Sequence, residues 1–467
     1  MPVARTQFWR SLAVVAAAVT AGCGTPGGLR NPDGPGAQIP MPERFIEAPD
    51  VAARATFGGH AWWQTLGDRH LDRLVATALS ENLGLRETGS RVVAAGATLR
   101  QANAQLFPSV DATGEVSRRW GEVGGGGGGG RDGRDGDEAS LGALLDWEVD
   151  IFGRLRAARR AAARELEATR ADLEGARLLL SASVAESYFG RIEQRQQLAL
   201  LAEQIEVGET LLRLTRLRFG QGQAAIVDVL QQEEQLRATR ALVPTVEGRV
   251  TELGYTLDAL LGRPPGGAPR DGPASLPQPP PLPATCLPSD LLLHRPDLVA
   301  AQERLAALDA QVAEAVADRL PRFQLSAASL AESGGSSLAT NLVASVVAPL
   351  FDAGDRRAEV TRRRAELEGA VAAFGDTFLG ALRDVESALV SGRAQAERLR
   401  RQESQLETAE RLLAETRIRY SQGLTEYLPV LTALTSVQQL QRDLITTRRE
   451  RLSQRISLHR ALGGPLP

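Results

Sequence analysis

The chain has 467 residues, 43% of them hydrophobic, with 54 basic and 57 acidic side chains and a formal net charge of -3. All the basic residues are arginine, and they form no basic block, which excludes a nucleic-acid-binding surface. Aromatic residues make up only 4%, and the abundance of Ala, Leu and Arg is typical of long helices that pack through small side chains.

Residues 1–22 have the features of a signal peptide. Arg5 and Arg10 precede an apolar run that ends in Thr20-Ala21-Gly22-Cys23. Small residues before a cysteine are typical of bacterial lipoproteins, in which the chain is cut before the cysteine and its thiol is acylated. The alternative is an ordinary signal peptide with an incidental cysteine. We predict lipidation of Cys23, followed by a Pro- and Gly-rich tether over residues 23–60.

A helix is predicted from Asp68 to Leu106, and Pro108 ends it. After the signal peptide, no uncharged apolar run reaches the roughly 18 residues of a membrane-spanning helix. If the chain crosses a membrane, it must therefore do so with strands.

A two-residue alternation of apolar and polar side chains follows the first helix. It covers residues 109–117 and 141–151, and it returns more weakly at 323–327 and 338–348. These patterns predict two β-hairpins, at about 107–152 and 321–351. A hairpin on a soluble protein shows the same alternation, but secretion and strand lengths near ~9–11 residues favour membrane strands. Since four strands leave two bare edges in lipid, the prediction demands several copies, and three would close a twelve-stranded barrel.

Each hairpin precedes a long helical segment, at residues 153–219 and 354–420. The first spans 67 residues without proline (219 minus 153, plus 1), which corresponds to about 100 Å of helix. Both segments carry apolar residues at alternating four and three spacing, which predicts coiled-coil packing. Return helices are expected at 225–261 and 427–462.

The two halves repeat each other. Arg218-Phe219-Gly220-Gln221-Gly222 recurs as Arg419-Tyr420-Ser421-Gln422-Gly423, and Leu261-Gly262 recurs as Leu462-Gly463, both at an offset of 201 (419 minus 218; 462 minus 261). Nearer the first hairpin, Phe152 pairs with Phe351 at an offset of 199. We predict two structural repeats, 61–262 and 291–467, joined by a Pro-rich connector at 263–290. The helix-hairpin tips lie at about 219–227 and 420–428, where Gly222 and Gly423 suit positive φ and close helix approach.

Several motifs give the chain a resemblance to a known family. They are Trp62-Trp63-Gln64, the paired turns, and Leu287-Pro288-Ser289-Asp290-Leu291-Leu292 followed by Arg295-Pro296-Asp297. With these, the mature chain resembles the outer membrane factor family, the TolC-like efflux proteins, and among them the NodT- and OprM-type lipoproteins. The resemblance implies a mainly α fold with a membrane β-barrel: a homotrimer whose twelve-stranded barrel continues into a periplasmic helical tunnel.

The resemblance also implies a passive duct in the outer membrane, without catalysis or cofactor. Such ducts dock on a periplasmic adaptor and an inner-membrane pump of the resistance-nodulation-division class, and pass drugs, toxic compounds or metal ions outward. The repeated turns are then the periplasmic tip. The implied adaptor-docking residues are Arg218, Gly222, Ala225, Arg419 and Gly423, and the gate candidates are Asp228, Glu426 and Tyr427.

One departure from the family pattern concerns the gate. Relatives often carry Asp at the position of Thr425, so Glu426 becomes the candidate for a displaced acidic ring, which would select cations. The alternative for these charged residues is a solvated helix end.

Enzymatic and metal-binding interpretations have little support. A run of seven glycines precedes an acidic loop instead of a helix, which argues against phosphate binding, and Asp132, Asp135 and Asp137 could at most bind Ca²⁺ weakly. The four histidines are scattered without ligand spacing. The main alternative function is a lipid-anchored periplasmic coiled-coil adaptor or structural protein without a pore. Adaptors do not ordinarily carry two membrane-type hairpins in a duplicated frame.

Overall fold

The computed structural model describes residues 44–47, 61–118, 137–266, 273–279, 288, 291–332 and 338–464. The signal peptide, Cys23, the glycine run, and Asp132 and Asp135 lie outside these ranges. The chain divides into two compact units, one containing residues 95–166 and 303–373, the other containing 40–94, 167–302 and 374–467. Each unit is described by itself.

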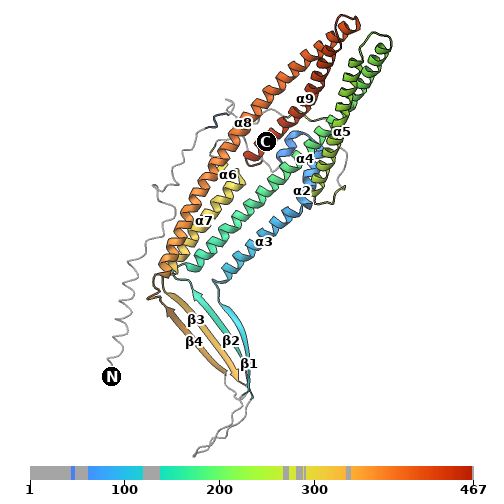
Figure 1. Cartoon of the computed structure of the whole chain (residues 1–467). Coiled ribbons are helices and arrows are strands. Elements are labelled where there is room, and N and C mark those ends of the chain that lie inside the picture. Colours follow the sequence, from blue (N-terminus) through green and yellow to red (C-terminus); the bar gives the residue numbers. More distant parts are fainter. Residues whose placement is uncertain are drawn as a thin grey trace, which may run out of the picture. The chain divides into compact units, whose positions relative to one another are not determined.

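The first unit contains a four-stranded antiparallel sheet in the order β1-β2-β3-β4 (Figure 1). Its strands are β1 (Ser109–Arg118), β2 (Asp137–Val149), β3 (Arg322–Glu332) and β4 (Leu338–Val347), which confirms both predicted hairpins. The register places Val110 opposite Leu145, Leu145 opposite Ala327, and Ala327 opposite Leu342. Because side chains alternate across a strand, the apolar sets of all four strands therefore share one face.

This apolar face is not covered by the part of the chain that the structure describes. Val110 is 68% exposed, Leu141 69% and Leu342 69%. The opposite face carries Asp111, Thr113, Glu115, Asp146 and Gln324. Within the described residues, β1 and β4 each pair on one side only. The sheet thus has two open edges and an apolar face without a core behind it.

The helices that precede the strands are shorter than the sequence predicts. The segment expected as one helix from Asp68 to Leu106 is α2 (Arg69–Glu81) and α3 (Leu83–Ala104), preceded by a 3-10 turn, η1 (Trp62–Leu66). The single-helix prediction was wrong because Asn82 interrupts it in an extended conformation, with ψ of 126°. Its side chain accepts a hydrogen bond from the amide of Leu85 at 2.9 Å and donates to the carbonyl of Leu260 at 2.9 Å, which fixes the break.

The long helices follow the predicted repeat. They are α4 (Arg154–Gly220) and α8 (Asp355–Ser421), of 67 residues each, with the return helices α5 (Ile226–Leu260) and α9 (Leu428–Ala461). The shorter α6 (Leu291–His294) and α7 (Pro296–Ala317) complete the second repeat. None of the helices described is long and apolar enough to cross a membrane.

The start of the long helices corrects one detail of the repeat. A glycine with positive φ precedes each of them, Gly153 at 81° and Gly354 at 90°, again at an offset of 201 (354 minus 153). Phe152 therefore corresponds to Ala353, and its pairing with Phe351 was wrong. The single offset holds from the first residue of the long helices to the ends of the return helices.

The core of the second unit surrounds Trp62, which is 1% exposed. Its indole Nε1 donates to Ser181 Oγ at 3.0 Å, and its ring stacks on the buried His459 at 5.2 Å between centroids. Leu71, Val75 and Ala78 of α2 pack there with Leu257 and Leu261. Burial, and to a lesser extent the neighbouring Arg455, lowers the pKa of His459 to about 4, so its imidazole is neutral at neutral pH.

Candidate functional site

The two helix-hairpin tips have the same turn. In the first, Gly222 N donates to Phe219 O at 2.9 Å and Gln223 N to Arg218 O at 2.8 Å; in the second, Gly423 N donates to Tyr420 O at 3.0 Å and Leu424 N to Arg419 O at 2.9 Å. This pattern is the Schellman motif, which requires positive φ at the residue after the helix. Gly222 has φ of 72° and Gly423 of 74°, which confirms the conformational part of the prediction.

The predicted close approach of helices at these glycines was wrong for the chain itself. A Cβ added at Gly222 or Gly423 would have no atom within 4 Å. The close approaches are at the other repeated glycines. A Cβ at Gly262 would lie 2.4 Å from Glu81 O, and one at Gly463 would lie 2.8 Å from His294 O. Gly222 and Gly423 are therefore required only for the backbone conformation of the turns. Gly262 and Gly463 are also required for close packing against a neighbouring backbone.

Arg218 connects the two hairpins at their tips. Its guanidinium carbon lies 4.3 Å from the ring centroid of Tyr420, and its Nη1 donates to Tyr420 O at 3.2 Å. This is a cation–π contact between the end of α4 and the end of α8. The Tyr420 hydroxyl is buried without a hydrogen-bond partner among the described residues, so it takes no part in the contact with Arg218.

Tyr427 forms the second connection, and it is buried, with 2% of its surface exposed. Its hydroxyl donates to Oε1 of Gln232, a fully buried side chain whose Nε2 donates to Gly208 O at 3.0 Å. Burial raises the pKa of Tyr427 to about 12, and the nearby Tyr420 and Asp228 add to the shift. The phenol is therefore a neutral donor at physiological pH. A hollow of about 440 Å³ lies beside Arg218, Tyr420 and Tyr427.

The remaining predicted residues differ in what they contact. Asp228 accepts from the amide of Ala225 at 3.2 Å and so caps the start of α5. Glu426 and Arg419 are exposed, and neither side chain has a hydrogen bond or ion pair within the ranges that the structure describes. Gly222, Ala225 and Gly423 are exposed as well. The tips thus combine a junction between the hairpins, formed by the Arg218–Tyr420 and Tyr427–Gln232 contacts, with the exposed charges of Arg419 and Glu426.

A polar seam continues the junction along α4 and α9, which lie side by side (Figure 1). Gln197 Nε2 donates to Arg442 O at 2.8 Å, and Gln204 Nε2 donates to Gln438 O at 3.1 Å. Farther along, Glu186 accepts from Arg449 at 2.9 Å and from Ser453 at 2.6 Å. Within the chain, the first hairpin therefore packs against the second through α4 and α9.

Residues 44–47 of the predicted tether contact α8. Phe45 is 2% exposed, and the carboxylate of Glu386 accepts from the amides of Ile46 at 2.6 Å and Glu47 at 3.1 Å. Arg393 pairs with Glu47 and donates to its carbonyl oxygen at 2.9 Å. No sequence pattern indicated this contact, because it joins residues about 340 positions apart.

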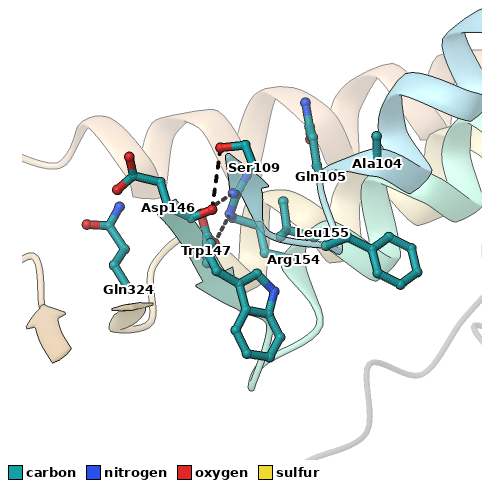
Figure 2. A pocket seen from close by; sticks show the side chains of 10 residues that line it. Ala104, Gln105, Ser109, Asp146, Trp147, Arg154, Leu155 and Gln324 are labelled. Atoms are coloured by element: carbon teal, nitrogen blue, oxygen red, sulfur yellow. Dashed lines mark hydrogen bonds and ion pairs between the residues drawn. The ribbon is translucent and has the colours of Figure 1, made fainter. Parts of the chain in front are cut away.

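The cavity of about 670 Å³ at the base of the sheet has no catalytic arrangement (Figure 2). Ser109 Oγ contacts the main-chain oxygen of Asp146 at 3.5 Å and no base, and Arg154 forms a bidentate pair with Glu148 at 3.1 and 2.8 Å. Trp147 Nε1 donates to Leu106 O at 3.1 Å. These contacts brace strand to helix, and the described residues contain no cluster of three or more metal-ligating side chains.

Comparison with known proteins agrees with this geometry. The family model described as outer membrane efflux protein matches residues 74–263 and 287–464, which cover most of both repeats and include both tips. The chain belongs to the outer membrane efflux protein family. Members of this family are passive channels, and the chain is an efflux channel of the outer membrane and no enzyme. The alternative of a pore-less periplasmic adaptor is thereby excluded.

Individual members of the efflux family are similar over most of the chain. The pyoverdine export outer membrane protein OpmQ of Pseudomonas aeruginosa is 32% identical over 86% of this chain and 87% of its own. The probable outer membrane lipoprotein SilC of Salmonella typhimurium is 25% identical over 91% and 93%. The solved structure of the outer-membrane channel OprN superposes with a TM-score of 0.82 at 27% identity, covering 91% of this chain and 97% of that one.

Proposed function

We propose that three copies of this chain form the outer-membrane duct of a tripartite efflux assembly. In the trimer, β4 of each copy pairs with β1 of the next, which closes a twelve-stranded barrel around a pore. The observation that carries this proposal is the sheet. Its apolar face is largely exposed, and its two edges have no partner strand among the residues described. Open edges in lipid leave backbone groups unsatisfied at several kcal/mol each, and pairing between copies removes that cost.

The helix-hairpin tips are proposed to receive a periplasmic adaptor, which connects the duct to an inner-membrane pump of the resistance-nodulation-division class. The proposed docking residues are Gly222, Ala225, Arg419 and Gly423, which are exposed in the single chain, and Arg218, which is half-buried by its stack on Tyr420. Glu426, exposed at the tip, is the gate candidate that can form an acidic ring. Asp228 and Tyr427 support it by capping α5 and by joining the hairpins.

The duct is proposed to carry small molecules that the pump captures: drugs, toxic compounds or metal ions. The name of the relative OpmQ refers to pyoverdine export, one example of such cargo. We further propose that Cys23 is acylated and holds the chain in the outer membrane, consistent with the lipoprotein name of SilC. The contact of residues 45–47 with Glu386 of α8 then limits how far the lipid lies from the body.

Mass spectrometry tests the assembly and the anchor together. In detergent, the native mass is expected to equal three chains. The denatured mass is expected to start at Cys23 and to exceed the polypeptide mass by its acyl chains. The matched Cys23→Ser variant keeps the trimer and loses the added mass. A monomeric or dimeric native mass would contradict the duct, whereas an unmodified N-terminus would remove the lipid anchor alone.

A further inference from the structure

The in-chain junction at the tips has a repeat-equivalent that the single chain leaves open. Adding 201 to Arg218 gives Arg419, and subtracting 201 from Tyr420 gives Phe219. The stack of Arg218 on Tyr420 thus corresponds to a stack of Arg419 on Phe219. The described part of the chain contains the stack of Arg218 on Tyr420 and no contact between Arg419 and Phe219.

Both members of this second pair are free. Arg419 is exposed, its side chain makes no hydrogen bond or ion pair with any part of the chain that the structure describes, and Phe219 is 44% exposed. The same difference between the two hairpins, one covered and one exposed, is found just after the hairpin turns. Tyr427 is 2% exposed against the first hairpin, whereas its repeat-equivalent Ile226 (427 minus 201) is 49% exposed. The side of the first hairpin that bears Phe219 and Ile226 therefore lacks the cover that the second hairpin has.

We propose that Arg419 of each copy stacks on Phe219 of the neighbouring copy. This inference rests on the proposed ring of three copies, in which the second hairpin of one chain meets the first hairpin of the next. Because both tips have the same Schellman turn, the carbonyl of Phe219 is placed as that of Tyr420 is, and the guanidinium of Arg419 can donate to it in the same way. The ring of tips then contains alternating in-chain and cross-copy arginine–aromatic contacts.

The chemistry of the neighbouring positions fits this assignment. In the chain, Tyr427 donates to Gln232, and both are buried. Their repeat-equivalents are Ile226 and Ala433, which have no polar side-chain atom to satisfy. At Ile226 and Ala433 the cross-copy junction therefore leaves no polar atom unsatisfied, and it gains no hydrogen bond. Since it lacks the buried hydrogen bond that Tyr427 makes to Gln232 within the chain, the junction between copies is the weaker of the two and separates first when the tip opens.

Thiol cross-linking tests the contact directly, in full-length protein carrying Cys286→Ser. The pair Phe219→Cys with Arg419→Cys and a short bis-maleimide is expected to give covalently linked trimers on a denaturing gel. The pair Arg218→Cys with Tyr420→Cys is expected to stay monomeric, because its link is within the chain. As a distance control, Phe219→Cys is combined with Arg411→Cys, an exposed residue two turns back on α8, and is expected to give no link.

The outcomes separate the two proposals. A native mass of three chains without a 219–419 link overturns this contact and leaves the duct intact. A native mass other than three overturns both.

A double-mutant cycle supplies a second readout. Arg419→Ala and Phe219→Ala are each expected to speed hydrogen exchange at the tips by about two- to fivefold, the equivalent of an exposed cation–π contact. The double variant is expected to match either single variant. Additive effects of the two substitutions would overturn the contact, because residues that do not touch contribute independently.

Discussion

Replacing Tyr427 with phenylalanine removes one oxygen atom from the junction between the two hairpins. The hydroxyl is the donor to Gln232 Oε1, and the Gln232 side chain is fully buried. Its other polar group stays engaged, since Nε2 donates to Gly208 O at 3.0 Å. The substitution thus leaves a single buried carbonyl oxygen without a donor, with no change in the packing of the ring.

An unsatisfied buried acceptor costs about 1–3 kcal/mol. At 1.4 kcal/mol for each factor of ten, the opening equilibrium of the tip shifts by roughly 5- to 150-fold. The matched control is Tyr420→Phe, which also removes a phenolic oxygen at the tip. That hydroxyl has no hydrogen-bond partner among the described residues, and the change recreates the Phe219 of the first repeat. It is expected to be neutral or slightly stabilising.

Hydrogen exchange followed by mass spectrometry measures the effect. Peptides covering 218–232 and 420–434 are expected to exchange faster in Tyr427→Phe by the factor above, while peptides from the sheet do not change. Tyr420→Phe is expected to leave all of them unchanged. Equal acceleration by the two substitutions, or none by Tyr427→Phe, would refute the assignment of Tyr427 as the hydrogen-bonded connection between hairpins.

Three further predictions concern the glycines, the core histidine and the tip carboxylates. Gly463→Ala is expected to destabilise the fold by about 2–4 kcal/mol, because the added Cβ meets both a positive φ and a backbone atom at 2.8 Å. Gly423→Ala meets a positive φ alone and is expected to cost about 1 kcal/mol. Denaturant titration compares the two free energies of unfolding, and equal costs would contradict the close approach at Gly463. The pKa of His459 is about 6.5 in the unfolded chain and about 4 in the folded protein, so the unfolded state binds the proton first as pH falls. The stability that comes from the neutral ring is therefore complete above about pH 6.5, and about 3 kcal/mol of it is lost as pH falls to 4. His459→Gln is expected to remove this part of the pH dependence of thermal unfolding, and an unchanged pH profile would refute it. Glu426→Gln is expected to lower cation selectivity in planar bilayers without changing the unfolding midpoint, whereas Asp228→Asn, which weakens the cap of α5, lowers the midpoint by a few degrees; the reverse pattern would exchange their roles.

The sequence predicts the architecture because its signals are local or repeated. Alternation over ten residues gives β1 and β4, and proline-free periodicity gives α4 and α8. The repeated Arg-aromatic-x-x-Gly motif places both tips within two residues of the observed helix ends. The single helix expected across Asn82 failed, because a side chain that caps the next helix and bonds to Leu260 leaves no periodic trace.

Contacts between the repeats were not predictable in this way. Arg218 and Tyr420 are 202 positions apart, and Tyr427 and Gln232 are 195 apart, so no spacing rule connects them. The repeat held a usable signal, since an arginine precedes an aromatic residue in both copies. The resemblance assigns Tyr427 to the gate, and that stays a prediction; its hydrogen bond to Gln232, which joins the hairpins, had no sequence signal. Nothing in the sequence indicated that the segment around Phe45 packs on α8.

Single-channel recording in planar lipid bilayers tests the central claim most directly. Purified mature protein, shown by native mass to contain three chains, is expected to give long-lived, discrete conductance steps, and Arg419→Ala is expected to raise the conductance of each step by loosening the tips. A trimeric preparation that inserts into the bilayer and conducts no ions at any voltage, with Arg419 present or replaced, would contradict the duct.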